Sequence, residues 1–140
     1  MAKNSYHDFL SKVPLFAGLD RQELDVVASA VTELDFGPGE TLMRSGSAAR
    51  EMLIVIEGTL SVTDADEHVA DIGPGGFAGE MGLLSDEPRS ATVSTKTEVR
   101  LLHIDARSFD HVLHEAPEIA VKMLPIVASR VVHNNVRHTD

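Results

Sequence analysis

The sequence predicts a mainly β protein with flanking helices. Between residues 31 and 104, short apolar or alternating runs are separated by turns rich in glycine, aspartate and proline. On both sides of this stretch, the apolar residues recur at helical spacing instead. Many short strands at such spacing are typical of a closed barrel or a jelly roll. The expected strands are 31–36, 40–43, 52–57, 59–63, 68–72, 90–95 and 98–104.

The N-terminal segment predicts two short helices. The first spans about Ser5 to Lys12 and ends before Pro14, because the residue before proline avoids the helical region. Asp20 is placed to cap the second helix, and Glu23, three residues later, completes a capping box. The apolar face of this second helix contains Leu24, Val27, Ala28 and Val31.

Two further helices are expected after the strands. Asp105 is placed to cap the first, over about 106–115, and Pro117 opens the second, which runs to about Arg137. An apolar stripe on the last helix is most simply core packing, with a lid or a dimer interface as alternatives. Its members are Ala120, Val121, Leu124, Val127, Ala128, Val131 and Val132.

Proline lies inside this last expected helix. Pro125 has no N–H group to donate to the preceding turn, and its ring clashes with that turn. We therefore expect a kink or a break between Lys122 and Pro125.

Size and composition limit the possible functions. The 140 residues are 43% hydrophobic, which predicts one folded domain. The chain has no run of 18 apolar residues and no signal-peptide core, so we expect no membrane insertion. The absence of cysteine fits a cytoplasmic protein. The net charge of −10 and the lack of a recognition helix after the last expected helix predict no DNA binding by this chain alone.

Residues 75–93, GGFAGEMGLLSDEPRSATV, carry the chemistry of the chain. A glycine-rich turn leads into Glu80, at the start of a short helix expected over about Gly79 to Leu84. A carboxylate there accepts hydrogen bonds only, so sugar hydroxyls are natural partners. Arg89 offers a rigid fork of donors for two phosphate oxygens, and Ser90 adds a hydroxyl. The pattern suits a small ligand with sugar hydroxyls and one phosphate.

This segment resembles the phosphate-binding cassette of cyclic nucleotide-binding domains. The family includes protein kinase A regulatory subunits, catabolite activator proteins and cyclic-nucleotide-gated channels. Segments 13–19, 37–40 and 52–58 also resemble it, so that the resemblance spans about Pro14 to Val132. The cassette positions that match are Phe77, Gly79, Glu80, Met81, Gly82, Leu83, Leu84, Pro88, Arg89, Ala91 and Thr92.

The resemblance implies a ligand and a set of residues that bind it. Cyclic AMP is the expected ligand, with cyclic GMP as the alternative, and no cofactor is expected. Glu80 would bind the ribose 2′-hydroxyl. Arg89 would bind the cyclic phosphate, helped by Ser90 and by the backbone amides of Gly79 and Met81. The expected binding residues are Phe77, Gly79, Glu80, Met81, Gly82, Arg89, Ser90 and Ala91.

The resemblance also implies the architecture and the partners. We expect one domain over 1–140: a helical segment at about 5–30, a β-jelly-roll barrel of about eight strands at 31–104, and C-terminal helices at 105–137. The last helix would cap the base with a residue among 131–136, form a homodimer, or contact an effector protein. The remaining alternatives are a partner-binding module without a ligand, and a fragment of a larger transcription factor or transporter.

The sequence departs from the family at one position. An acidic residue that orients the phosphate-binding arginine is frequent in the family where this chain has Arg50. Either Glu51 substitutes for it, or Arg89 is held differently, or binding is weaker.

Metal and catalytic sites are not expected. His111 and His114 are spaced to share a helix face but match no metal-ligand motif. Asp64, Asp66 and Glu67 fit a hairpin turn better than a calcium loop, which would have glycine at the position of Val69. The sequence shows no set of residues typical of an enzyme.

Overall fold

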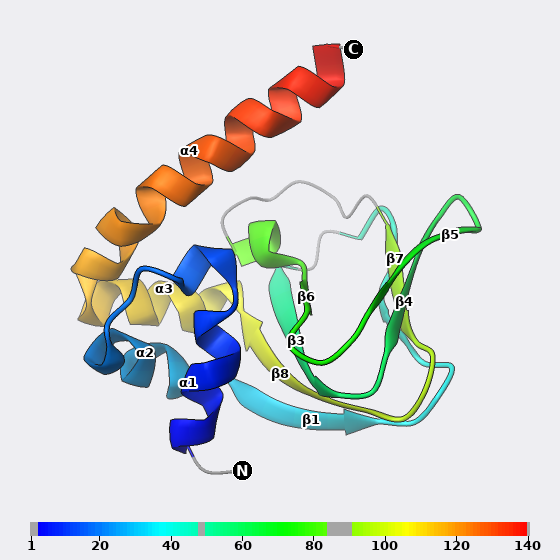
Figure 1. Ribbon diagram of the computed structural model, residues 1–140, viewed down its shortest axis with the longest axis horizontal. Coiled ribbons are helices and arrows are strands. Elements are labelled where there is room, and N and C mark those ends of the chain that lie inside the picture. Colours follow the sequence, from blue (N-terminus) through cyan, green and yellow to red (C-terminus); the bar gives the residue numbers. More distant parts are fainter. Residues whose placement is uncertain (1–2, 48–49, 84–90, 140) are drawn as a thin grey trace. The chain divides into compact units, whose positions relative to one another are not determined.

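The computed structural model describes residues 3–47, 50–83 and 91–139. The chain divides into two units, and Figure 1 labels the elements of each. One unit contains Met1–Ser29 and His111–Asp140 and is helical. The other, Ala30–Asp110, contains all the described strands. The predicted combination of a mainly β structure with flanking helices is therefore confirmed.

Two four-stranded antiparallel sheets form the β unit. Sheet A has the order β1 (Thr32–Phe36), β8 (Val99–Asp105), β3 (Glu51–Glu57) and β6 (Phe77–Ala78). Sheet B has the order β2 (Thr41–Met43), β7 (Thr92–Thr95), β4 (Leu60–Asp64) and β5 (Glu67–Ile72). Seven of these strands lie at the expected places. The two-residue strand β6 was not predicted, because its residues belong to the glycine-rich stretch.

The two sheets pack face to face around an apolar core. Leu53 and Val55 of β3 contribute to this core, and the whole run from Met52 to Ile56 is buried. A strand that is buried along its length is expected from a continuous apolar sequence. The buried members of the core are Met43, Leu53, Val55, Leu60, Val93, Val99 and Leu101.

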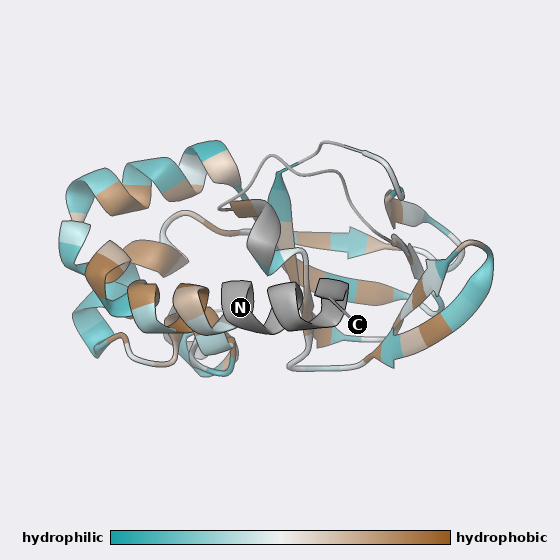
Figure 2. Cartoon of the chain, turned by 90° about the horizontal axis from the view of Figure 1, so that it is seen from above, coloured by the Kyte–Doolittle hydropathy of each residue, from teal (hydrophilic) through white to brown (hydrophobic). Residues whose placement is uncertain are grey.

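Two turns in the β unit require unusual backbone conformations. Gly58, between β3 and β4, has φ of +92°, and a Cβ atom there would lie 2.1 Å from the carbonyl oxygen of Glu98. Ala65 and Asp66, between β4 and β5, have φ of 52° and 67°, as a type I′ hairpin turn requires. The hairpin interpretation of this segment is therefore confirmed. The hydrophilic colour of the hairpin end is visible in Figure 2.

The helical unit contains α1 (Lys3–Ser11), the 3-10 turn η1 (Pro14–Phe16), α2 (Arg21–Ala28) and most of α4 (Pro117–Thr139). The predicted capping box is confirmed. The Glu23 amide donates to Asp20 Oδ1 at 2.9 Å, and the Asp20 amide donates to Glu23 Oε1 at 2.8 Å. Helix α3 (Ala106–Glu115) begins in the β unit, and the Ser108 amide donates to Asp105 Oδ1 at 2.7 Å, as expected for a cap.

Helix α4 continues through Pro125, so that of the expected kink or break only the break is excluded. The proline leaves the carbonyl of Val121 without an intrahelical donor, and water can satisfy it because the Val121 side chain is 64% exposed.

The buried face of α4 is also not the expected stripe. Ile119 and Met123 are buried, whereas Val121 and Leu124 are exposed. The helix packs against η1, and that contact selects the face that is buried.

Candidate functional site

Strand β6 leads the chain into the cassette. Its residues pair with β3 in the register Ile54↔Phe77 and Leu53↔Ala78. Gly79 follows with φ of +82°, a conformation that favours glycine. The next four residues, Glu80–Leu83, form the 3-10 turn η2. A short helix was predicted here, and a segment of this length is typical of a 3-10 turn rather than an α-helix.

Glu80 is the first residue of η2 and is buried, at 5% exposure. Gly79, in its left-handed backbone conformation, lies immediately before it. A carboxylate in this position can accept hydrogen bonds from two adjacent hydroxyl groups. This chemistry suits the diol or the 2′-hydroxyl of a ribose.

The structure describes only part of the expected binding set. Phe77 begins β6, Gly79 lies directly before Glu80, and Ala91 directly precedes β7. The backbones of Met81 and Gly82 belong to η2, but the Met81 side chain lies outside the described part of the chain. Arg89 and Ser90 also lie outside the described residues, as does Pro88.

Arg50 precedes β3 and binds the far end of η2. Its Nη2 donates to the Leu83 carbonyl oxygen at 3.3 Å. Its own carbonyl oxygen accepts from the Ala106 amide at 2.9 Å, where α3 begins. These bonds join residues far apart in the sequence, and no local pattern predicts them.

Glu51, the residue considered as a substitute for the family's acidic residue, binds a histidine. The distance from Glu51 Oε2 to His103 Nε2 is 2.6 Å, and both side chains are about one quarter exposed. The hydrogen bond that His103 donates to Glu51 raises the pKa of His103, while partial burial acts in the opposite direction. The sequence does not predict this pair, because its members lie on different strands.

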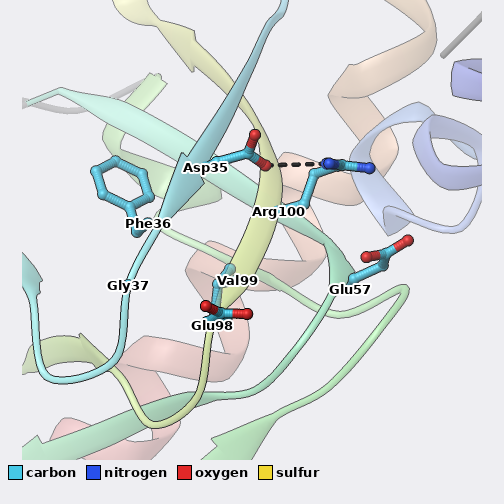
Figure 3. Close-up of a pocket in the computed structure, with 7 residues that line it drawn as sticks. All are labelled: Asp35, Phe36, Gly37, Glu57, Glu98, Val99 and Arg100. Carbon is cyan, nitrogen blue, oxygen red and sulfur yellow. Dashed lines mark hydrogen bonds and ion pairs between the residues drawn. The ribbon is translucent and has the colours of Figure 1, made fainter.

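A surface cleft lies at the other end of β3. Figure 3 shows Arg100 directed toward Asp35, with Glu57 on the neighbouring strand. Arg100 Nε donates to Asp35 Oδ1 at 2.9 Å. This hydrogen bond, together with the negative charges of Asp35 and Glu57, raises the pKa of the guanidinium. The cleft also contains Glu98, so its charge is predominantly negative. Such a lining does not suit an anionic ligand, and none of the expected binding residues belongs to it.

Among residues 3–47, 50–83 and 91–139, no group of three histidine, aspartate or glutamate residues is arranged to hold a metal ion. Within the same residues, no helix has both the length and the apolar character needed to cross a membrane.

Comparison with known proteins identifies the family. The sequence profile described as the cyclic nucleotide-binding domain matches residues 33–116. A cyclic nucleotide-gated potassium channel of Rhizobium etli is 38% identical over 79% of this chain and 31% of its own length. The type II regulatory subunit of cAMP-dependent protein kinase from Drosophila melanogaster is 29% identical over 98% of this chain and 39% of its own. The chain thus spans about a third of the length of these relatives.

Solved structures agree on the fold. The N-terminal domain of a transcriptional regulator from Streptomyces coelicolor matches with a TM-score of 0.84 and 29% identity, over 94% of this chain and 95% of that domain. The structure of cAMP-bound PfPKA-R matches with a TM-score of 0.72 and 24% identity, over 97% of this chain and 44% of that one. These similarities show a jelly-roll fold.

The fold and the cassette define a ligand-binding regulatory domain. More specifically, the chain belongs to the family of cyclic nucleotide-binding domains. Domains of this family are regulatory rather than catalytic.

Proposed function

We propose that this chain is a sensor domain that binds cyclic AMP and passes the binding event to its C-terminal helices. The observation that carries the proposal is the buried Glu80, placed at the start of η2 directly after Gly79 and within the matched region. A buried carboxylate suits the ribose 2′-hydroxyl, because an ionised carboxylate accepts hydrogen bonds and a hydroxyl can donate one.

Arg89 is proposed to bind the cyclic phosphate. A guanidinium presents two parallel donors to two phosphate oxygens, which makes this contact both strong and directional. Ser90 and the amides of Gly79 and Met81 add donors to the same group. The proposed binding residues are Phe77, Gly79, Glu80, Met81, Gly82, Arg89, Ser90 and Ala91.

Two observations favour cyclic AMP over cyclic GMP. Ser90 stands where threonine is associated in the family with preference for cyclic GMP. The fly relative is named as a regulatory subunit of cAMP-dependent protein kinase, and it aligns with nearly the whole chain.

Signalling requires that the ligand favour one arrangement of the helices. A ligand shifts an equilibrium only by binding one conformation more tightly than another. We propose that residues 1–140 act as one domain in the cytoplasm, with a residue among 131–136 covering the base. The partner is an effector protein, a second copy, or another segment of a longer chain, and this chain alone does not bind DNA.

Calorimetric titration with cyclic AMP, cyclic GMP and 5′-AMP tests the proposal. We expect saturable binding of cyclic AMP, weaker binding of cyclic GMP and none of 5′-AMP. Arg89→Glu is expected to abolish binding, because it replaces the cation with a charge that repels phosphate, while the far-UV circular dichroism stays unchanged. Near-normal affinity in Arg89→Glu would refute the assignment of the phosphate contact. If the folded wild-type protein binds neither cyclic nucleotide, the chain is a partner-binding module instead.

A further inference from the structure

The side chain of Arg50 supports the end of the cassette turn. The last carbonyl groups of a helical turn have no partner within the turn, and a nearby arginine can supply one. Arg50 Nη2 does so for Leu83, the last residue of η2, at 3.3 Å. The Leu83 side chain is only 2% exposed, so that the end of η2 is held by packing as well as by this hydrogen bond.

The main chain of the same residue supports the start of α3. The Ala106 amide donates to the Arg50 carbonyl at 2.9 Å, next to the paired positions Glu51↔Asp105 of β3 and β8. Asp105 in turn caps α3 through the Ser108 amide. One residue therefore bonds to the end of η2 through its side chain and to the start of α3 through its backbone.

We propose that Arg50 is a positioning residue for cyclic-nucleotide binding, which fixes η2 relative to β3 and to the start of α3. The inference rests on the proposed function of the cassette. Because η2 has only four residues, a displacement at Leu83 is transmitted to Glu80 at its other end. The family resemblance leads us to expect an acidic side chain at position 50. An ionised carboxylate could not hydrogen-bond to the Leu83 carbonyl, because it has no proton to donate.

Calorimetry with cyclic AMP on the wild type, Arg50→Met, Arg50→Lys and Arg50→Asp tests this role. Methionine keeps much of the length but none of the donors, and lysine keeps a cation that can donate. We expect Kd to rise about tenfold for Arg50→Met, at least as much for Arg50→Asp, and much less for Arg50→Lys. Arg21→Met is the matched control, because Arg21 is an exposed residue at the start of α2, outside the cassette and β3, and its Kd should equal that of the wild type.

A second readout separates positioning from general stability. In the unliganded protein, the amide resonances of 80–83 and Ala106 should shift in Arg50→Met and return toward the wild-type values in Arg50→Lys. A purely structural role would lower the melting temperature of Arg50→Met without changing the Kd of the folded fraction.

Equal Kd values for the wild type and Arg50→Met, or tighter binding by Arg50→Asp, would overturn the role of Arg50 alone. Failure of the wild type to bind any cyclic nucleotide would overturn the proposed function, and with it this role.

Discussion

Glu51 of β3 and His103 of β8 form a hydrogen-bonded pair across two neighbouring antiparallel strands, with 2.6 Å between Oε2 and Nε2. His103 stands directly opposite Leu53 in the ladder, and Glu51 lies two residues before Leu53 on the same face of the strand, so that the contact is a diagonal one. Diagonal neighbours in a sheet lie within reach of long side chains. The pair occupies the end of the sheet from which Arg50 binds η2.

This pair should make the stability of the protein depend on pH. The pKa of His103 is raised in the folded state, chiefly by the hydrogen bond with Glu51. The stabilisation is therefore fully present below the unfolded pKa of about 6.5 and is lost as the pH rises through the higher folded pKa. Urea unfolding should show that the free energy of unfolding falls more steeply between about pH 6 and pH 8 in the wild type than in His103→Gln. Glu51→Gln should flatten the curve in the same way, and unchanged slopes in both variants would contradict this account.

Glu80 should account for recognition of the ribose. Loss of a hydrogen bond to a charged group is worth about 1.5–3 kcal/mol, so Glu80→Ala should weaken cyclic AMP binding by roughly 10- to 100-fold. The discriminating measurement uses 2′-deoxy cyclic AMP. The wild type should bind it much less tightly than cyclic AMP, whereas Glu80→Ala should bind both with nearly equal affinity. A variant that still distinguishes the two ligands as the wild type does would show that another group binds the 2′-hydroxyl.

Gly58 should not tolerate any side chain. Both Gly58 and Gly39 have positive φ, but a Cβ at Gly39 meets nothing within 4 Å, whereas one at Gly58 would lie 2.1 Å from the Glu98 carbonyl. Gly39→Ala should therefore cost only the backbone strain, about 1–2 kcal/mol. Gly58→Ala should cost at least about 3 kcal/mol, because the turn before β8 must also move. Chemical denaturation of the two variants measures the difference, and equal losses would argue against the steric contribution.

The capping box should contribute measurably to the stability of α2. Asp20→Ala removes the acceptor for the Glu23 amide and should lower the free energy of unfolding by about 1 kcal/mol. Glu23→Ala should be more damaging, because Glu23 is buried and also binds Lys122 Nζ at 2.6 Å. Asp20→Asn is the control, since asparagine caps helices about as well as aspartate. A loss in Asp20→Asn as large as that in Asp20→Ala would show that charge, and not capping, is responsible.

Local signals explain why much of the fold could be predicted. The Asp20–Glu23 capping box, the Asp105 cap and the strand at 52–57 each depend on residues a few positions apart or on one apolar run. The cassette could be recognised for the same reason, because its matched positions follow one another closely along the chain.

Contacts between distant segments explain what could not be predicted. Strand β6 exists because β3 offers it a partner, and its two residues carry no strand signal of their own. The buried face of α4 is selected by packing against η1, so that Ile119 and Met123 are buried instead of Val121 and Leu124. The Arg50–Leu83 bond depends on the folded arrangement of β3 and η2, which spacing along the chain does not reveal.

The chain passes from one sheet to the other within the cassette, since β6 belongs to sheet A and β7 to sheet B. The register of β6 is fixed by β3, and that of β7 by β2 and β4. Residues inserted between 84 and 88 would therefore leave the pairs Leu53↔Ala78 and Val62↔Val93 in place. The pairing within each sheet is therefore independent of how many residues separate Leu83 from Ala91.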